Sequence, residues 1–409
     1  MLELIKLAWR NVWRNWRRTM IAVVAIVLSL ALLIFAAALM DGIDNTVYGN
    51  MVRLYGGNVL IHAPGFRERA SRLPMLPLTD AEAVLAVVNK QPNVLAASRR
   101  INTGGLLSNR DASHAVGITA VEPDVEGPVS LVAENIVAGR YLTADDGDSI
   151  LIGQELADEL NVTVGDRVSL LGRRKDESMR QRTMTIVGIF DLGLGEAEKS
   201  LLYMNLPVAQ QLYNLRGQET EIAVILDEVG QERAFVQEVS PALPNYEVDA
   251  LETLRPEFRE AMATDRATVT VMATIMLTMA GIGILNLMLM AAFERTREMG
   301  VLAALGLKGR QTILLFVLEG AFIGLVGALI GCLLGWLLLA IVGQTGIDIS
   351  YAAEAGEIYA LMGDRMYPST GLRTILSYGL IAIVVAVLAS LIPAWQASRK
   401  EPAESLHYI

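Results

Sequence analysis

Four long stretches of this chain contain almost no charged residue. They span residues 20–40, 267–293, 311–347 and 374–398, and only the third is interrupted, by Glu319. A helix of about 20 apolar residues crosses the ~30 Å hydrocarbon core of a bilayer, and the third stretch has residues to spare for tilt. The sequence therefore predicts four transmembrane helices. Four buried helices in a soluble core are the alternative, but runs of this length are hard to place in one core.

The first apolar stretch follows Arg17 and Arg18, as the apolar part of a secretory signal peptide would. That part of a signal peptide has about 7–15 residues and precedes a cleavage site flanked by small residues. Here the stretch is longer, and it leads into Asp41 without such a site. We therefore interpret it as a signal anchor that is not cleaved.

Charge is distributed unevenly along the chain. The 34 Lys and Arg and 44 Asp and Glu give a formal net charge of −10. Residues 1–18, 294–310 and 399–409 together hold 11 basic and 5 acidic residues, a net +6, so the remainder carries −16. Short loops rich in Lys and Arg stay in the cytoplasm. We therefore expect both termini and 294–310 in the cytoplasm, and the acidic segments 42–266 and 346–373 on the other side.

These features predict a membrane α-helical protein with four transmembrane helices and a large α+β extracytoplasmic domain inserted between helices 1 and 2. The expected segments, in chain order, are a cytoplasmic amphipathic interfacial helix at 1–18, transmembrane helix 1 at 19–41, the extracytoplasmic domain at 42–266, transmembrane helix 2 at 267–293, a cytoplasmic coupling loop at 294–310, transmembrane helix 3 at 311–345, a short outer loop at 346–373, transmembrane helix 4 at 374–398, and a cytoplasmic tail at 399–409.

The first 18 residues place a stripe of tryptophans beside a stripe of arginines, if they form a helix. The residues are Trp9, Trp13 and Trp16, with Arg10, Arg14 and Arg17 one position later. Indoles prefer the headgroup level of a membrane, and guanidinium groups bind phosphates. We expect an interfacial anchor on membrane lipids. A plain stop signal without a defined helix is the alternative.

The segment 42–266 reads as a mixture of helices and strands. We expect a helix at 78–90 with Thr79 as its N-cap, and hairpin strands at 167–171 and 183–190. The loop between these strands is a possible contact for an outer partner, and its basic residues are Arg173, Arg174, Lys175, Arg180 and Arg182.

Residues that carry out chemistry are scarce. The chain has one cysteine and three histidines, and it lacks G-x-S-x-G and H-E-x-x-H motifs. The acidic residues are scattered as on a solvated surface. We therefore expect no catalytic residue, no metal site and no enzyme activity. The acidic balance also argues against nucleic-acid binding.

The loop after the second apolar stretch has charged residues first and apolar residues after. Met299, Leu302 and Leu305 suit a groove on a soluble partner, and Gly306 stands where a C-terminal glycine ends a helix. A connector lying on the surface is the alternative. The nearest approach to a phosphate-binding loop, 306–312, lacks the Gly-Lys-Ser/Thr ending, so powered work requires nucleotide hydrolysis by another chain.

The third apolar stretch has glycines spaced three or four residues apart. They are Gly320, Gly324, Gly327, Gly331 and Gly335. One helical face of small residues lets backbones approach closely, which favours a packing seam over a pore. Glu319 precedes them, and a charge at membrane depth is costly. Two interpretations remain open: structural pairing with a cation, or a role in coupling.

Taken together, these segments resemble an ABC transporter permease of the MacB/FtsX/LolC-LolE superfamily, the type VII or mechanotransmission type. The resemblance covers the whole chain and rests on motifs in a fixed order: Leu7-Ala-Trp-Arg-Asn-Val-Trp-Arg-Asn-Trp-Arg-Arg-Thr19, Gly139-Arg-Tyr-Leu, Ile150-Leu-Ile-Gly-Gln-Glu-Leu-Ala, Val164-Gly-Asp-Arg-Val168, Glu294-Arg-Thr-Arg-Glu-Met-Gly, Ala303-Ala-Leu-Gly306, Glu319 with its glycines, Ile392-Pro-Ala-Trp-Gln-Ala-Ser-Arg and Glu401-Pro-Ala-Glu-Ser-Leu406. The closing motif and the Val-Gly-Asp-Arg-Val region look most like lipoprotein-releasing LolC/LolE-type permeases.

The resemblance implies a bacterial inner-membrane protein that pairs with a second permease, itself or a paralogue. It implies two copies of a cytoplasmic ATPase, which would bind the ATP and Mg, with no cofactor on this chain. The outer domain looks like a MacB-like periplasmic core with a mixed α/β lobe and a β-rich lobe. The residues that look like the ATPase-coupling helix are Glu294, Arg295, Arg297, Glu298, Met299, Gly300, Leu302, Leu305 and Gly306.

In such permeases ATP drives motion of the outer domains, and substrate is released or exported from the outer side. Lipoprotein or another hydrophobic envelope substrate is expected, with a periplasmic adaptor or carrier as a partner. The loop 172–182 takes the place of a proline-containing apolar hook in the LolC-type subunit, but here it is charged and has no proline. The alternative function is an FtsX-like signal transmitter that controls a partner such as a cell-wall hydrolase.

Overall fold

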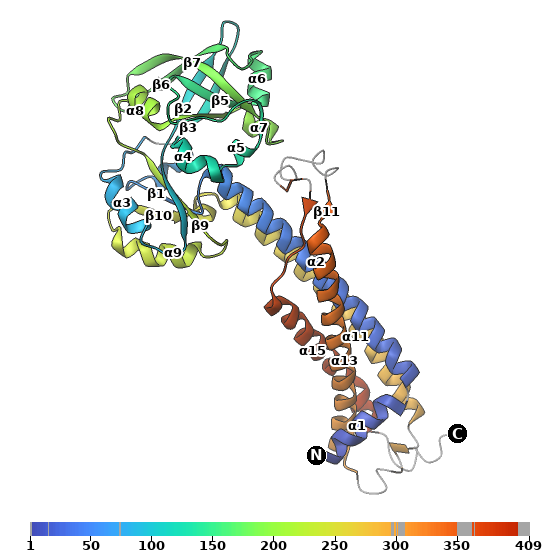
Figure 1. Ribbon diagram of the computed structural model, residues 1–409. Helices are drawn as coiled ribbons and strands as arrows, with labels where there is room; N and C mark the ends of the chain where they lie inside the picture. Colours follow the sequence, from blue (N-terminus) through green and yellow to red (C-terminus); the bar gives the residue numbers. More distant parts are fainter. Residues whose placement is uncertain are drawn as a thin grey trace. The chain divides into compact units, whose positions relative to one another are not determined.

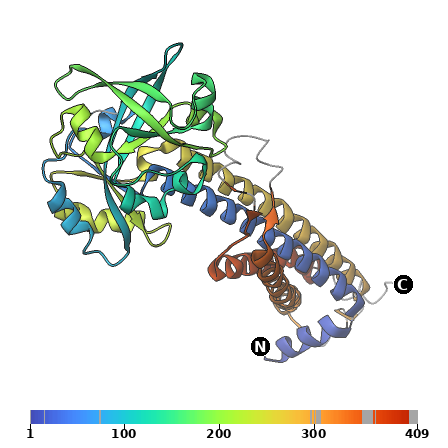
Figure 2. The same ribbon diagram turned by 45° about the horizontal axis from the view of Figure 1, so that its top comes forward.

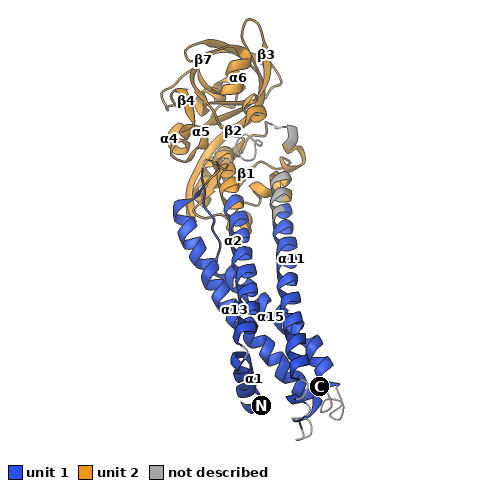
Figure 3. Cartoon of the chain, turned by 90° about the vertical axis from the view of Figure 1, so that its right-hand side faces the viewer, with its two compact units in different colours: residues 1–43, 262–347, 366–409 blue, residues 44–261, 348–365 orange. Residues whose placement is uncertain are grey.

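A computed structural model describes residues 2–14, 16–72, 75–295, 298–299, 301, 307–349, 362–363 and 365–399 (Figure 1). Parts of the expected outer loop 346–373, and all of the tail except Arg399, lie outside these residues. The chain divides into two compact units (Figure 3). Unit 1 comprises residues 1–43, 262–347 and 366–409, and unit 2 comprises residues 44–261 and 348–365.

Unit 1 consists of helices. Four helices of the described residues are long and apolar enough to cross a membrane. They contain the four apolar stretches, except for residues 346 and 347 of the third, which follow α13. The helices that contribute to this unit are α1 (Leu2–Arg14), α2 (Trp16–Tyr55), α11 (Pro256–Glu294), α13 (Gly309–Thr345) and α15 (Leu372–Ser398). Residues 44–55 at the end of α2 and residues 256–261 at the start of α11 belong to unit 2.

The core of unit 1 is made where α2, α11, α13 and α15 share apolar side chains, among them Leu30, Ile284, Ile323 and Ala386. Helices α13 and α15 lie side by side along their length (Figure 1 and Figure 2). Much of the apolar surface of the four helices stays exposed in the single chain. That pattern is expected of helices that face lipid or a second membrane chain.

The glycines of α13 lie at close approaches to two different helices. A Cβ built on Gly320 would lie 2.6 Å from Cβ of Ser390 in α15, and one on Gly324 would lie 2.7 Å from Cβ of Ala386. The remaining three face α2: Gly327 meets Ile26, Gly331 meets Leu30 and Gly335 meets Ile34, with closest distances of 2.8, 3.0 and 3.1 Å. The glycines of α13 therefore form two helix-packing contacts: the first two glycines pack against α15, and the last three pack against α2.

Unit 2 is built on a ten-stranded sheet with the order β10-β1-β9-β2-β3-β8-β5-β7-β4, in which β6 also pairs with β2 and β7. The strands are β1 (Val59–His62), β2 (Val94–Ser108), β3 (Ser113–Val121), β4 (Ile136–Gly139), β5 (Ser149–Gly153), β6 (Arg167–Arg173), β7 (Met179–Phe190), β8 (Leu201–Asn205), β9 (Glu221–Leu226) and β10 (Glu247–Ala250). The two-residue strands β11 (Ile347–Asp348) and β12 (Arg365–Met366) form a separate pair.

Short helices connect the strands of unit 2. They are η1 (Arg67–Arg72), α3 (Ala81–Val88), α4 (Pro123–Glu126), η2 (Gly127–Val129), α5 (Leu131–Glu134), α6 (Gln154–Leu160), α7 (Gly195–Glu198), α8 (Leu206–Tyr213), α9 (Glu232–Val239), η3 (Ser240–Ala242) and α10 (Leu251–Leu254). The side chains of α6 and α8 enter one apolar core, and those of α3 and α9 enter another.

These two cores define two lobes, which share the long strand β2. In the first lobe β10 pairs with β1, β1 pairs with β9, and β9 pairs with residues 94–100 of β2. The core of this lobe includes Val59, Val84 and Phe235. In the second lobe, successive pairings close a ring of six strands, β2-β3-β8-β5-β7-β6. Apolar residues fill the ring, because side chains of each strand alternate between its inside and outside.

Two local expectations can be compared with these elements. The hairpin is confirmed: β6 and β7 pair antiparallel, with Val168 opposite Met184. The N-cap expected at Thr79 is wrong. The carboxylate of Asp80 accepts a 3.0 Å hydrogen bond from the Ala83 amide, and an aspartate in this position satisfies an amide that the first turn leaves unpaired.

Candidate functional site

A polar cluster is buried in unit 1, where α1 meets α13 and the end of α11. Asn11 Nδ2 donates a 2.6 Å hydrogen bond to Oε1 of Glu319, and Arg295 Nη1 donates one of 3.1 Å to the same oxygen. Arg295 Nη2 donates to the Asn11 carbonyl at 3.2 Å. The three residues are 4–7% exposed. The cluster therefore joins three separate segments through one buried ion pair.

The chemistry of the cluster explains why a charge is tolerated there. Moving a carboxylate or a guanidinium out of water costs several kcal/mol, and good geometry with additional hydrogen bonds offsets this cost. Glu319 and Arg295 neutralise one another, and Asn11 supplies the additional bonds. Loss of either charge would leave the other buried without a counter-charge.

Two ion pairs at the surface of unit 1 surround the buried cluster. Arg14 Nη2 lies 2.6 Å from Oε2 of Glu298, and both side chains are about half exposed. The guanidinium of Arg18 donates to both carboxylate oxygens of Glu294. An exposed ion pair alone contributes little stability. Together with the buried pair, however, these contacts attach residues 294–298 to the N-terminal helices at three points.

The structure describes only part of the expected coupling helix. Glu294 ends α11, and the amide of Met299 donates to the Arg295 carbonyl at 2.9 Å, which is one helical turn. Met299 is half-buried and Val301 is exposed. Arg297, Gly300, Leu302, Leu305 and Gly306 lie outside the described residues.

The tryptophans and arginines of the expected anchor are mostly exposed. Trp9, Trp13 and Trp16 expose 45–55% of their surface. Trp9 also makes edge contacts with Trp13 and with Phe322 of α13, at ring-centre distances of 5.8 and 5.3 Å. Arg10 and Arg17 are exposed, whereas Arg14 is held by Glu298.

Sequence reasoning missed two residues of this site. Asn11 and Arg18 were not among the expected site residues, yet Asn11 pairs with Glu319 of α13 and Arg18 pairs with Glu294 at the end of α11. Both belong to the N-terminal motif that carries the family resemblance. The residue that follows them in the motif, Thr19, donates a 2.8 Å hydrogen bond to the Val12 carbonyl. The N-terminal motif is therefore the sequence feature from which Asn11 and Arg18 could have been identified as site residues.

The basic loop of unit 2 is partly paired within its own unit. Arg173 lies 2.7 Å from Glu177, Arg182 lies 2.6 Å from Asp148, and Lys175 donates to Gln218 at 3.0 Å. Arg180 is exposed on β7. Three basic side chains of the loop therefore already have partners within unit 2, which leaves fewer of them available for an outer partner.

The chain matches two protein-family models. The MacB-like periplasmic core domain matches residues 19–242, and the FtsX-like permease C-terminal domain matches residues 270–402.

Named relatives and solved structures are also similar to this chain. Lipoprotein-releasing system transmembrane protein LolC of Xylella fastidiosa is 23% identical over 404 residues, which cover 95% of this chain and 94% of that protein. Macrolide export ATP-binding/permease protein MacB of Hyphomonas neptunium is 24% identical over 425 residues, covering 99% of this chain and 60% of that protein. The periplasmic region of MacB from Actinobacillus actinomycetemcomitans is 16% identical, with a TM-score of 0.34, and covers 50% of this chain and 94% of that structure.

Proposed function

The chain belongs to the ABC transporter permeases of the MacB/LolC family, and we propose that it couples ATP hydrolysis by a separate ATPase subunit to motion of unit 2 outside the membrane. In this proposal both termini and residues 294–310 face the cytoplasm. Unit 2 is the extracytoplasmic domain between the first two spans, and two permeases pair with two ATPase copies. The distribution of Lys and Arg along the chain supports this orientation.

The observation that carries the proposal is the three-point attachment of residues 294–298. Arg295 is bound to Asn11 and Glu319, and the two surface ion pairs hold the residues on either side of it. Separating the buried pair costs several kcal/mol. A partner that pushes on this segment would therefore move α1, α11 and α13 together, rather than bend the segment alone.

The relatives favour one kind of permease subunit for this chain. LolC of Xylella fastidiosa and this chain cover nearly all of each other, whereas MacB, whose name includes an ATP-binding part, extends well beyond it. We therefore propose a LolC-like subunit, which releases lipoprotein or another hydrophobic envelope substrate. The FtsX-like transmitter is the second candidate, and the FtsX-like permease match favours it equally at the level of the membrane domain.

Co-purification with candidate cassette ATPases from the same genome tests the proposal. We expect the wild-type chain to bind one of them and to change its ATPase rate, and Met299→Asp to weaken this binding at least tenfold. Val125→Asp is the matched control, because Val125 is exposed on unit 2. Failure of the wild-type chain to bind any cassette ATPase contradicts the proposal.

Glu298 requires a separate design, because it already pairs with Arg14. Arg14→Glu and Glu298→Arg each place like charges together, and the double variant restores an ion pair of reversed polarity. If Glu298 acts only by holding α1, the double variant regains ATPase coupling. If it contacts the ATPase itself, the double variant remains uncoupled although the pair is restored.

A further inference from the structure

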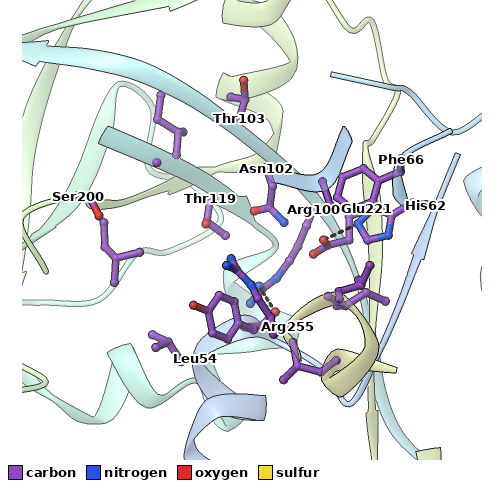
Figure 4. A pocket seen from close by; sticks show the side chains of 18 of the residues that line it. Leu54, His62, Phe66, Arg100, Asn102, Thr103, Thr119, Ser200, Glu221 and Arg255 are labelled. Atoms are coloured by element: carbon purple, nitrogen blue, oxygen red, sulfur yellow. Dashed lines mark hydrogen bonds and ion pairs between the residues drawn. The ribbon is translucent and has the colours of Figure 1, made fainter. Parts of the chain in front are cut away.

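A cavity of about 530 Å³ lies in unit 2, lined by residues of both lobes and by the unit 2 ends of α2 and α11. We call it the inter-lobe cavity (Figure 4). His62 and Glu221 come from the first lobe, Thr119 and Tyr203 come from the second, and Leu54 lies near the end of α2. Its volume is within the range of small-molecule binding sites.

A buried carboxylate in the wall of this cavity lacks a complete set of partners. Glu221 Oε2 and His62 Nε2 lie 2.8 Å apart, and the two residues are 3% and 1% exposed. The other oxygen, Oε1, is buried and accepts no hydrogen bond from any described residue. The Asn102 side chain lies close enough to lower the pKa of Glu221, but Oε1 itself still has no hydrogen-bond partner among the described residues. A buried acceptor of this kind is costly unless something donates to it.

Glu221 is an acceptor because it stays ionised. Burial alone would raise its pKa, but the hydrogen bond and charge of His62, the charge of Arg100 and the Asn102 side chain outweigh burial and hold the pKa of Glu221 below its ordinary value. A carboxylate in this state only accepts hydrogen bonds. The group that completes Oε1 must therefore carry an O–H or N–H.

The charges around the cavity balance one another. The buried guanidinium of Arg100 forms an ion pair with Glu126 and donates to the Tyr55 carbonyl at 2.6 Å. The other acidic side chain, Glu221, lines the same cavity as Arg255. The guanidinium carbon of Arg255 lies 4.9 Å from the centre of the Tyr55 ring. A ligand with a net charge would disturb this balance, so an uncharged ligand fits best.

The rest of the lining is largely apolar. It includes Leu54, Leu60, Phe66, Ile118, Leu251 and Leu254. Phe66 is fixed by stacking on His62, with ring centres 3.5 Å apart and planes 4° apart. This surface would hold the apolar body of a ligand next to the unsatisfied oxygen of Glu221.

We propose that the inter-lobe cavity binds a small, uncharged amphipathic molecule whose hydroxyl group donates to Oε1 of Glu221. Its apolar body lies against the leucines and Phe66. Because the wall is shared by both lobes and by the ends of α2 and α11, the ligand holds these four parts of unit 2 together. The proposal is independent of the coupling function and of the transported substrate.

Photolabelling of the full chain in lipid nanodiscs tests this proposal. The probes are an octanol that carries a diazirine on its chain, and the methyl ether of the same molecule, which lacks the donor. Labelled residues are identified by peptide mass spectrometry and normalised to labelling of the exposed Leu329 in α13. We expect saturable labelling of cavity residues by the alcohol and about tenfold less by the ether, since a hydrogen bond to a charged group is lost.

Two variants complete the test. Thr119→Phe fills the cavity from β3 and should abolish the labelling, whereas Ser113→Phe, on an exposed position of the same strand, should leave it unchanged. Equal labelling by alcohol and ether would overturn the proposal. So would labelling of the cavity that persists in Thr119→Phe. Absence of saturable labelling in the cavity would show that it holds water only, and would also overturn it.

Discussion

The side-chain amide of Asn11 donates a 2.6 Å hydrogen bond to Oε1 of Glu319, a residue 308 positions later in the chain. This bond connects the first helix to the third candidate span and completes the burial of the Glu319–Arg295 pair. The N-terminal helix is therefore part of the polar interior of unit 1, in addition to presenting tryptophans at its surface.

Removing the carboxylate of Glu319 should destabilise unit 1 without preventing insertion. In Glu319→Leu the guanidinium of Arg295 stays buried without a counter-charge, and breaking such a pair costs about 3–5 kcal/mol. We expect a lower thermal midpoint in nanodiscs and weaker stimulation of the partner ATPase.

The double variant Arg295→Leu, Glu319→Leu separates the structural role of the ion pair from its role in coupling. It should recover most of the stability, because two apolar residues replace the pair, but remain uncoupled. Recovery of normal coupling in the double variant would assign the pair a purely structural role.

Enlarging a glycine of α13 should disrupt its packing. A Cβ on Gly327 already lies 2.8 Å from Cγ2 of Ile26, so Gly327→Leu overfills the seam at a cost of about 1–3 kcal/mol. Thermal unfolding of the purified chain measures this cost. Gly283→Leu in α11 is the matched control, since a Cβ there meets no described atom within 4 Å. Equal losses in the two variants would exclude the seam as the cause.

The stability of unit 2 should decrease in acid through Asp146. The hydrogen bonds from Arg140, and those from Thr143, lower the pKa of Asp146 from 3.8 to about 2. A group whose pKa is lower in the folded state contributes stability above the unfolded pKa and loses it as the pH falls through the folded pKa. The unfolding midpoint of the wild-type chain should therefore fall more steeply between pH 3.8 and about 2 than that of Asp146→Asn. Parallel curves for the two proteins would show that this ion pair does not contribute to acid sensitivity.

Unit 2 and the start of α13 should react with reagents from opposite sides of the membrane. Single cysteines at the exposed positions Asp124 and Gln311, in a Cys332→Ser background, are treated with a membrane-impermeant maleimide. We expect labelling of Asp124→Cys from outside in intact cells, and of Gln311→Cys only after permeabilisation. Labelling of both from outside contradicts the proposed orientation.

Much of the fold can be predicted from the sequence because it depends on local composition. The four uncharged runs specify four helices of membrane-crossing length, and alternating residues in 167–190 specify a hairpin. The N-cap of α3 could not be predicted in the same way. Thr79 and Asp80 are adjacent and both are good caps, so the start of the helix depends on how α3 packs in its lobe.

The Gly139-Arg-Tyr-Leu motif shows a similar limit. The sequence shows the motif, but the physical reason for its glycine appears only in three dimensions. Gly139 has φ +76°, and a Cβ there would lie 2.2 Å from the carbonyl oxygen of Val187 on β7. Arg140, the next residue, forms the ion pair with Asp146.

The number and length of the apolar helices can be predicted from the sequence, as can the placement of positive charge between them and the glycine face of α13. Each of these features is a property of one continuous stretch. Which groups meet is visible only in the folded chain. The partners of Glu319, the division of the glycine stripe between α2 and α15, and the unsatisfied oxygen of Glu221 all depend on residues far apart in the chain. A contact between distant residues leaves no local pattern in a single sequence, since either residue alone is compatible with many neighbours.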